Sequence, residues 1–251
     1  MNRIRSLACL VGALQFTAAV PAFAQGACSA HSGPTVTPVV ELYTSEGCSS
    51  CPPADKWLST LKADPSVVAL AFHVDYWDRL DWKDRFASAA YTQRQSEQQH
   101  TSGARFSYTP QVIEDGADRP DWPRLGSTLT SGKRPTSTVD IALMQQGAHV
   151  TASITPSAGA PSRLAAYWAV TEQRHVSAVK AGENEGVTLN HDYVVREYVP
   201  VAAWSTKAGG APSTLQFEPT IATDPAHPRN VNLVVVNADT GRPVQAAKLG
   251  C

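Results

Sequence analysis

The segment that decides the fold is Val40-Glu41-Leu42-Tyr43-Thr44-Ser45-Glu46-Gly47-Cys48-Ser49-Ser50-Cys51-Pro52-Pro53-Ala54-Asp55. Its first residues belong to an apolar run over 37–43 that predicts a strand. Its last residues open a predicted helix over 52–61, because proline is tolerated in the first turn of a helix. A C-x-x-C pair placed between a strand and a helix predicts thiol–disulfide chemistry.

The position of Cys48 just before a helix has a chemical consequence. A helix N-terminus carries unpaired N–H groups and the positive end of the helix dipole, and both stabilise a thiolate. The thiol pKa in such motifs falls from about 8.5 to roughly 3.5–7.5. We therefore expect Cys48 to be an ionised and reachable nucleophile, and Cys51 to be the more buried cysteine that resolves a mixed disulfide. The assignment as an enzyme depends on this accessibility.

Two segments of the 251-residue chain differ in their pattern. Residues 36–132 alternate apolar runs with helical stretches, and the nearly continuous apolar run over 67–74 is typical of a central parallel strand. This order predicts an α/β domain. Residues 136–251 hold short β-rich runs separated by turn residues, which predict a β-rich, sandwich-like region.

The N-terminus predicts export. Arg3 and Arg5 form a positively charged start, an apolar run follows over 7–20, and small residues at positions 22 and 24 suit a signal peptidase, so we expect residues 1–24 to be a signal peptide. The protein is then periplasmic or secreted, without a membrane span in the mature chain. The net charge of −1 offers no basic patch for nucleic acid.

Four cysteines remain after removal of the signal peptide, and they are Cys28, Cys48, Cys51 and Cys251. An even count in an oxidising compartment indicates disulfides. The simplest pairing joins Cys48 to Cys51, and joins Cys28 to Cys251 as a structural disulfide between the two ends of the mature chain.

Further segments carry a resemblance to known proteins: Phe72-His73-Val74-Asp75-Tyr76-Trp77, Thr92-Gln93-Arg94-Gln95, Tyr108-Thr109-Pro110-Gln111-Val112, Gly182-Glu183-Asn184 and residues 191–196. With the block over 41–55, the chain resembles the thioredoxin superfamily. More closely, it resembles a family of bacterial secreted thioredoxin-like proteins known mainly as a domain of unknown function. The resemblance implies a thioredoxin-like fold for residues 36–132.

The resemblance also implies roles for individual residues. Thr109 and Pro110 match the cis-proline position that faces the C-x-x-C pair and holds the substrate backbone. Glu41 is the candidate proton relay for Cys51. It lies seven residues before Cys48, whereas the superfamily places its buried acid six residues before, so two alternatives stay open: Glu41 points elsewhere, and Glu46 approaches the site.

Three functions remain open. The first is an exported thiol–disulfide oxidoreductase that acts on protein disulfides, needs no cofactor and is reset by an unidentified redox partner. The second is a Cu(I)-binding, metallochaperone-like module, since two thiolates of Cys48 and Cys51 with the imidazole of His73 suit that ion. The third is a redox-silent secreted interaction protein. Residues 182–186 are a loop that may dock a partner near the thiols.

Overall fold

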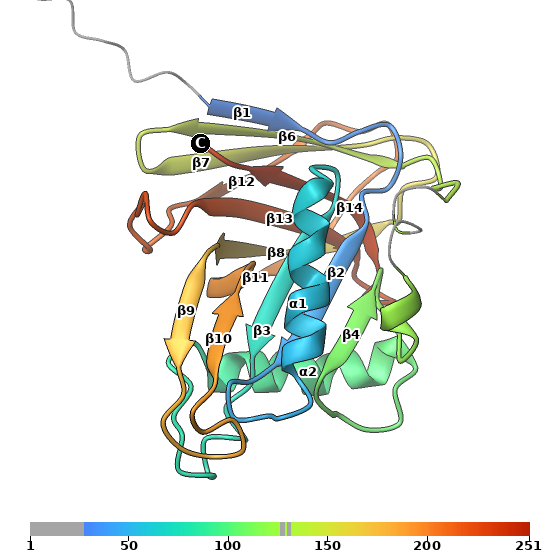
Figure 1. Cartoon of the computed structure of the whole chain (residues 1–251). Coiled ribbons are helices and arrows are strands. Elements are labelled where there is room, and N and C mark those ends of the chain that lie inside the picture. The colour runs from blue at the N-terminus through green and yellow to red at the C-terminus, as the bar shows by residue number, and fades with distance from the viewer. Residues whose placement is uncertain (1–27, 126–128, 130–131) are drawn as a thin grey trace, which may run out of the picture.

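The computed structural model describes residues 28–125, 129 and 132–251 (Figure 1). The predicted signal peptide lies outside these residues. Strands dominate the described chain, and the helices with described bounds are α1 (Pro52–Thr60), α2 (Ala89–Ser102) and the short 3-10 helices η1 (Leu61–Ala63) and η2 (Trp122–Arg124). Among the described residues, no helix has the length and apolar character needed to cross a bilayer.

The strands form one large sheet and two smaller ones. The large sheet has the order β14 (Pro243–Leu249), β13 (Arg229–Asn237), β8 (Arg163–Glu172), β11 (Val194–Ser205), β3 (Val68–His73), β2 (Val39–Thr44), β4 (Gln111–Glu114) and β5 (Ala117–Asp118). A four-stranded sheet has the order β1 (Cys28–His31), β6 (Val139–Gln146), β7 (His149–Pro156) and β12 (Ser213–Phe217). The hairpin-like pair is β9 (His175–Ala178) and β10 (Thr188–His191).

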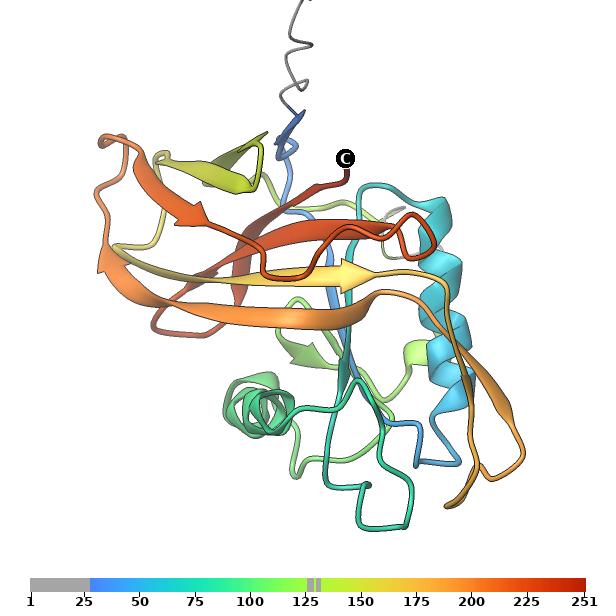
Figure 2. The ribbon, with the colours of Figure 1, turned by 90° about the vertical axis from the view of Figure 1, so that its left-hand side faces the viewer.

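Strands β2 and β3 are the centre of the part that carries the C-x-x-C pair. Every residue of both strands is buried, and they pair in parallel from Val39 opposite Val68 to Thr44 opposite His73. Helix α1 covers one face of these strands and α2 covers the other (Figures 1 and 2). Burial on both faces explains why their sequences are apolar without alternation.

The predicted fold class, an α/β thioredoxin-like domain followed by a β-rich sandwich-like region, is wrong. The structure is mostly β, with 43% strand and 13% helix. The physical reason lies at the edge of β3, where β11 pairs in parallel with Val194 opposite Ala71. Strands from both sequence segments therefore share one eight-stranded sheet. An apolar strand buried on both faces needs a partner on each edge, and residues far along the chain supply one of them.

The four-stranded sheet packs against the far half of the large sheet. Alternate residues of β6, Val139, Ile141 and Leu143, are buried between the two sheets, opposite residues such as Trp168 of β8. The disulfide between Cys28 and Cys251 joins β1 to the end of the chain after β14, with 6.2 Å between the two Cα atoms. The predicted structural disulfide is thus confirmed, and it links the two sheets.

Candidate functional site

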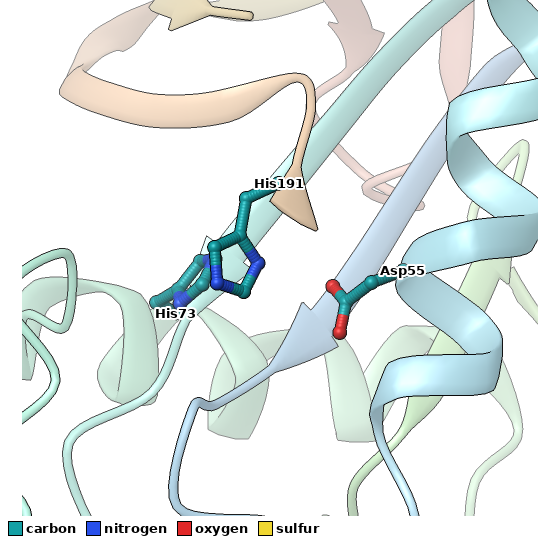
Figure 3. Close-up of side chains that lie close together, drawn as sticks. All are labelled: Asp55, His73 and His191. Carbon is teal, nitrogen blue, oxygen red and sulfur yellow. The ribbon is translucent and has the colours of Figure 1, made fainter. Parts of the chain in front are cut away.

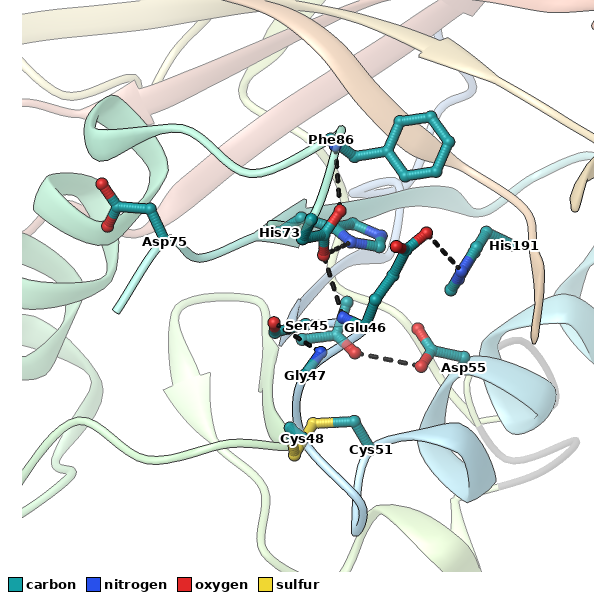
Figure 4. Close-up of polar contacts among 12 residues, drawn as sticks. Ser45, Glu46, Gly47, Cys48, Cys51, Asp55, His73, Asp75, Phe86 and His191 are labelled. Carbon is teal, nitrogen blue, oxygen red and sulfur yellow. Dashed lines mark hydrogen bonds and ion pairs between the residues drawn. A yellow bond between two sulfur atoms is a disulfide. The ribbon is translucent and has the colours of Figure 1, made fainter. Parts of the chain in front are cut away.

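The C-x-x-C pair lies in the turn between β2 and α1. Cys48 and Cys51 form a disulfide with 5.4 Å between their Cα atoms (Figure 4). The backbone N–H of Cys51 donates to the carbonyl oxygen of Cys48 at 3.2 Å, and α1 follows with Pro52 and Pro53 in its first turn. The fixed φ of proline suits these first helical positions. The predicted pairing of the two cysteines is confirmed.

Access to this disulfide differs from the expectation. Both Cys48 and Cys51 are 0% exposed, while Ser49 and Ser50 between them are exposed. The expectation that Cys48 is reachable at the tip of the helix is therefore wrong for the disulfide form of the protein. Any thiol chemistry at Cys48 requires its surroundings to move first.

The groups that surround the Cys48 sulfur also differ from the expectation. The first two positions of α1 are Pro52 and Pro53, which have no backbone N–H to offer a thiolate. The close polar contacts of Cys48 Sγ are instead two hydroxyls, Ser50 Oγ and Thr109 Oγ1, each at 3.4 Å. Hydroxyl donors stabilise a thiolate as N–H groups do, because both donate a hydrogen bond to the charged sulfur.

Thr109 is held in place by its own neighbours. Its hydroxyl accepts a hydrogen bond of 2.8 Å from Trp77 Nε1, and the peptide bond between Thr109 and Pro110 is cis. The structure thus brings Thr109 beside Cys48, as the sequence predicted. The substrate-binding role of Thr109 and Pro110 stays a prediction.

Residues 182–186 hold the C-x-x-C segment from outside. The buried Asn184 donates through Nδ2 to the carbonyl oxygens of Glu46, at 2.8 Å, and Cys48, at 3.0 Å. The exposed Glu183 accepts from the backbone N–H and the hydroxyl of Ser49, at 3.0 and 2.8 Å. The loop considered in the sequence as a docking loop therefore clamps the turn that carries the disulfide.

The first residue of this loop, Gly182, passes close to the backbone of Leu80. Gly182 has φ +78°, and a Cβ at this position would lie 3.0 Å from the carbonyl oxygen of Leu80. Both the left-handed backbone and the close approach favour glycine.

Glu41 lies in a different cluster. Its carboxylate contacts the guanidinium of Arg94 on α2 and the hydroxyl of Tyr167 on β8, and it accepts a hydrogen bond of 2.8 Å from Tyr43. Burial, reinforced by the charge of Glu41, raises the pKa of the Tyr43 and Tyr167 hydroxyls. These contacts lie on the α2 face of the large sheet, whereas α1 and Cys51 cover the opposite face.

A buried cluster of histidines and acids lies beside the disulfide (Figure 4). His73 at the end of β3 contacts Asp84 with 2.6 Å between Nδ1 and Oδ2. Burial acts to raise the pKa of Asp84, but the charge of His73, its hydrogen bond and the backbone N–H groups of Glu46 and Phe86 together outweigh burial, so the pKa is lowered. The Glu46 side chain accepts a 2.8 Å hydrogen bond from Trp82 and lies 3.3 Å from His191.

Asp55 belongs to the same cluster. It lies on the first turns of α1, and its Oδ2 accepts a hydrogen bond of 3.0 Å from the Thr44 hydroxyl. Burial raises the pKa of Asp55. Sequence reasoning did not connect Asp55, Asp84 and His191. The available signal was that Asp55 lies one turn after Cys51, and that His191 follows a short predicted strand over 187–189.

The proposed copper ligands are not brought into one group. Within the described chain, the set of histidine, cysteine and acidic side chains whose ligand atoms lie within 4.8 Å of one another consists of Asp55, His73 and His191. His73 therefore has other close neighbours than Cys48 and Cys51, and Figure 4 shows the cysteines on the far side of Gly47 from His73.

Comparisons with known proteins are consistent with this fold. The crystal structure of a protein from Agrobacterium tumefaciens is similar, with 28% sequence identity and a TM-score of 0.61 over 86% of this chain and 94% of that one. HBP35 of Porphyromonas gingivalis has a similar fold, with 15% identity and a TM-score of 0.57 over 86% of this chain and 76% of that one. No curated protein matches the chain.

Nothing in these comparisons supports the predicted membership of the thioredoxin superfamily, and that part of the resemblance is not upheld. The other part is. A family model described as a protein of unknown function, DUF1223, matches residues 39–237, which include the C-x-x-C pair, the clamp at Glu183 and Asn184, and the histidine–acid cluster. The chain belongs to the DUF1223 family.

Proposed function

We propose that the protein is an exported thiol–disulfide oxidoreductase that exchanges disulfides with protein thiols through Cys48 and Cys51. The observation that carries the proposal is the disulfide closed within the C-x-x-C turn, with two hydroxyls at 3.4 Å from Cys48 Sγ. A disulfide that encloses two residues restricts the unfolded chain little, so a purely structural role gains little from it. Both disulfides of the described chain are consistent with an oxidising compartment.

The exchange takes place in two steps. A substrate thiolate attacks Cys48 Sγ, so that a mixed disulfide forms, the Cys48–Cys51 bond breaks, and Cys51 leaves as a thiolate that takes up a proton. A second substrate thiolate then attacks the substrate sulfur of the mixed disulfide. The substrate leaves with its own disulfide, and Cys48 leaves as a thiolate. Two electrons pass from the substrate to the protein, and the reverse steps reduce a substrate disulfide.

Thr109 and Ser50 act in the second step, in which Cys48 leaves as a thiolate. Their hydroxyls lie where negative charge develops when Cys48 leaves as a thiolate. A hydrogen bond to a charged acceptor contributes about 1.5–3 kcal/mol, so a leaving thiolate is stabilised more than the neutral disulfide sulfur.

We infer that the loop over 182–186 moves when a substrate reaches Cys48. This loop is tied to the C-x-x-C turn by the two hydrogen bonds of Asn184 and the two of Glu183. The bonds of Glu183 are exposed to solvent, so they open at lower cost than those of the buried Asn184. A substrate that binds the loop and pulls Asn184 from the turn gains access to the sulfur, which restricts exchange to partners that engage the loop.

The test uses the reduced chain and a synthetic peptide disulfide. The wild type is expected to reduce the peptide, Cys48→Ser to be inactive, and Cys51→Ser to accumulate a mixed disulfide visible as the sum of the two masses. A variant with Cys28→Ser and Cys251→Ser, checked for folding by circular dichroism, is the matched control and is expected to keep the activity. Equal rates for the wild type and the variant lacking both Cys48 and Cys51 would refute the proposal.

A further inference from the structure

Three side chains from three elements meet beside α1. Asp55 comes from α1, His73 from the end of β3 and His191 from the end of β10 (Figure 3). Their ligand atoms all lie within 4.8 Å of one another. We infer that Asp55, His73 and His191 form a binding site for one first-row divalent metal ion, with Zn²⁺ as the expected occupant. This site is separate from the proposed chemistry of the cysteines and does not depend on it.

One ring nitrogen of each histidine lacks a partner. His73 is 0% exposed and His191 is 2% exposed. Nε2 of His73 and Nδ1 of His191 have no hydrogen-bond partner among the described residues. Leaving a buried polar atom without a partner costs about 1–3 kcal/mol. These two nitrogens, which converge with the carboxylate of Asp55, are accounted for when a cation occupies the space between them.

The ligand atoms lie close to the spacing of a metal site. In a tetrahedral site with metal–ligand distances of about 2.0–2.2 Å, neighbouring ligand atoms lie about 3.3–3.6 Å apart. The ligand atoms of the three side chains are within 4.8 Å of one another, so each pair has to close by at most about 1.5 Å.

Supporting groups stand behind the ligands. A metal-bound histidine usually donates its second ring N–H to a carboxylate, and ligating carboxylates are themselves hydrogen-bonded. His73 directs Nδ1 to Asp84 at 2.6 Å, which leaves Nε2 for the metal. Asp55 accepts at Oδ2 from the Thr44 hydroxyl at 3.0 Å.

His191 completes this pattern. Its Nε2 lies 3.3 Å from Oε1 of Glu46, a buried oxygen without another hydrogen-bond partner among the described residues. When His191 coordinates through Nδ1, its Nε2–H faces this oxygen and the carboxylate fixes the tautomer. Each of the three ligands then has a supporting group of its own.

A cleft offers an entry path to the site. It has a volume of about 450 Å³, lies between α1 and β10, and is lined by both Asp55 and His191. A metal ion can enter from this side, and the cleft leaves room for a fourth ligand such as water. Three protein ligands with an open fourth position are the arrangement of catalytic rather than structural zinc sites.

The donor set decides the class of metal. Two imidazoles and one carboxylate suit Zn²⁺ and neighbouring divalent ions, whereas Cu(I) prefers thiolates and Ca²⁺ and Mg²⁺ prefer oxygen ligands. Neither Cys48 nor Cys51 is part of the site, so the inferred site differs from a cysteine-based copper site in both its ligands and its metal.

The test is binding of Zn²⁺ alone to the full chain with its disulfides intact, measured by equilibrium dialysis with metal analysis. One Zn²⁺ per chain is expected for the wild type. Asp55→Asn and His191→Gln are expected to weaken binding at least tenfold, since even the loss of a supporting group costs 10–100-fold. Replacing Zn²⁺ by Co²⁺ gives a second readout, an absorption spectrum of nitrogen and oxygen ligands without thiolate bands.

The matched control is His175→Gln. His175 is buried and pairs with His191 across β9 and β10, but its Nε2 contacts Glu172 at 2.8 Å. This variant is expected to bind Zn²⁺ as the wild type does, and so is the variant with Cys48→Ser and Cys51→Ser.

Three results would overturn the inference: no stoichiometric binding to the wild type, binding that survives Asp55→Asn and His191→Gln, or binding lost with the cysteines. Because the cysteine variant loses thiol exchange but not Zn²⁺, failure of this inference is distinguishable from failure of the proposed function.

Discussion

Replacing Asn184 by alanine is expected to open the Cys48–Cys51 disulfide to reductants. The variant loses the hydrogen bonds to the carbonyl oxygens of Glu46 and Cys48, which tie the loop to the C-x-x-C turn. Each bond contributes about 1 kcal/mol net, so the two together stabilise the closed loop by about 2 kcal/mol. If reduction requires the loop to open, this difference corresponds to an increase of about 30-fold in rate.

The assay is the rate of reduction of the Cys48–Cys51 disulfide by a water-soluble phosphine, followed by alkylation and mass spectrometry. Glu185→Ala is the matched control, because Glu185 is an exposed residue of the same loop. Its reduction rate is expected to equal that of the wild type. If Asn184→Ala folds normally and its disulfide is reduced no faster than in Glu185→Ala, the reasoning about the loop is refuted.

Three further predictions concern the groups around the site. Thr109→Val removes a hydroxyl from the Cys48 sulfur and is expected to slow alkylation of reduced Cys48 at neutral pH about 3–4-fold. The lost bond of about 1.5 kcal/mol lowers the thiolate fraction about tenfold, and the higher nucleophilicity of the more basic thiolate offsets about half of this effect on a logarithmic scale; an unchanged rate would exclude the stabilising role. Glu41→Gln leaves the buried Arg94 charge without its carboxylate and is expected to lower the free energy of unfolding by about 3–5 kcal/mol in urea titrations. The thiol exchange rate of the folded variant is expected to equal that of the wild type, and slower exchange would instead support a proton relay through Glu41. Hydrogen bonds from the C-x-x-C segment lower the pKa of Glu183, so its contribution to loop closure is present above the unfolded-state pKa of about 4.3 and is lost as the pH falls through the lower folded-state value. As the pH falls over that range, the rate of phosphine reduction of the wild type, divided by the rate of Glu183→Gln, is expected to rise. A ratio that stays constant with pH would contradict this prediction.

The sequence predicted the local elements around the C-x-x-C pair because these depend on neighbouring residues. The apolar run over 67–74 predicted a buried strand, and the proline pair predicted where α1 begins. The even number of cysteines predicted both disulfides. The resemblance predicted that Thr109 lies beside Cys48, which the structure also shows.

The fold class could not be predicted in this way because strand order is a property of distant pairs. Nothing in the residues of β3 indicates that its edge pairs with β11, more than a hundred residues later. The same limit applies to the site. Asn184 and His191 reach the C-x-x-C turn and His73 only because β9 and β10 fold back beside α1.

The burial of Cys48 has a similar cause. A strand followed by C-x-x-C and a helix predicts an exposed sulfur when the turn stands alone. Here Asn184 and Thr109 approach the turn from two other parts of the chain. The accessibility of a side chain depends on such tertiary neighbours, which no local pattern records.

The most direct test of the redox function is the reduction potential of the Cys48–Cys51 couple. The chain is equilibrated in glutathione buffers of known potential, and a sample fully reduced by the phosphine defines the reduced end point. The oxidised fraction is read by alkylation and mass spectrometry. The proposed function predicts a value in the range of exchange proteins, about −120 to −270 mV. A value below about −300 mV, where structural disulfides of secreted proteins lie, would contradict it.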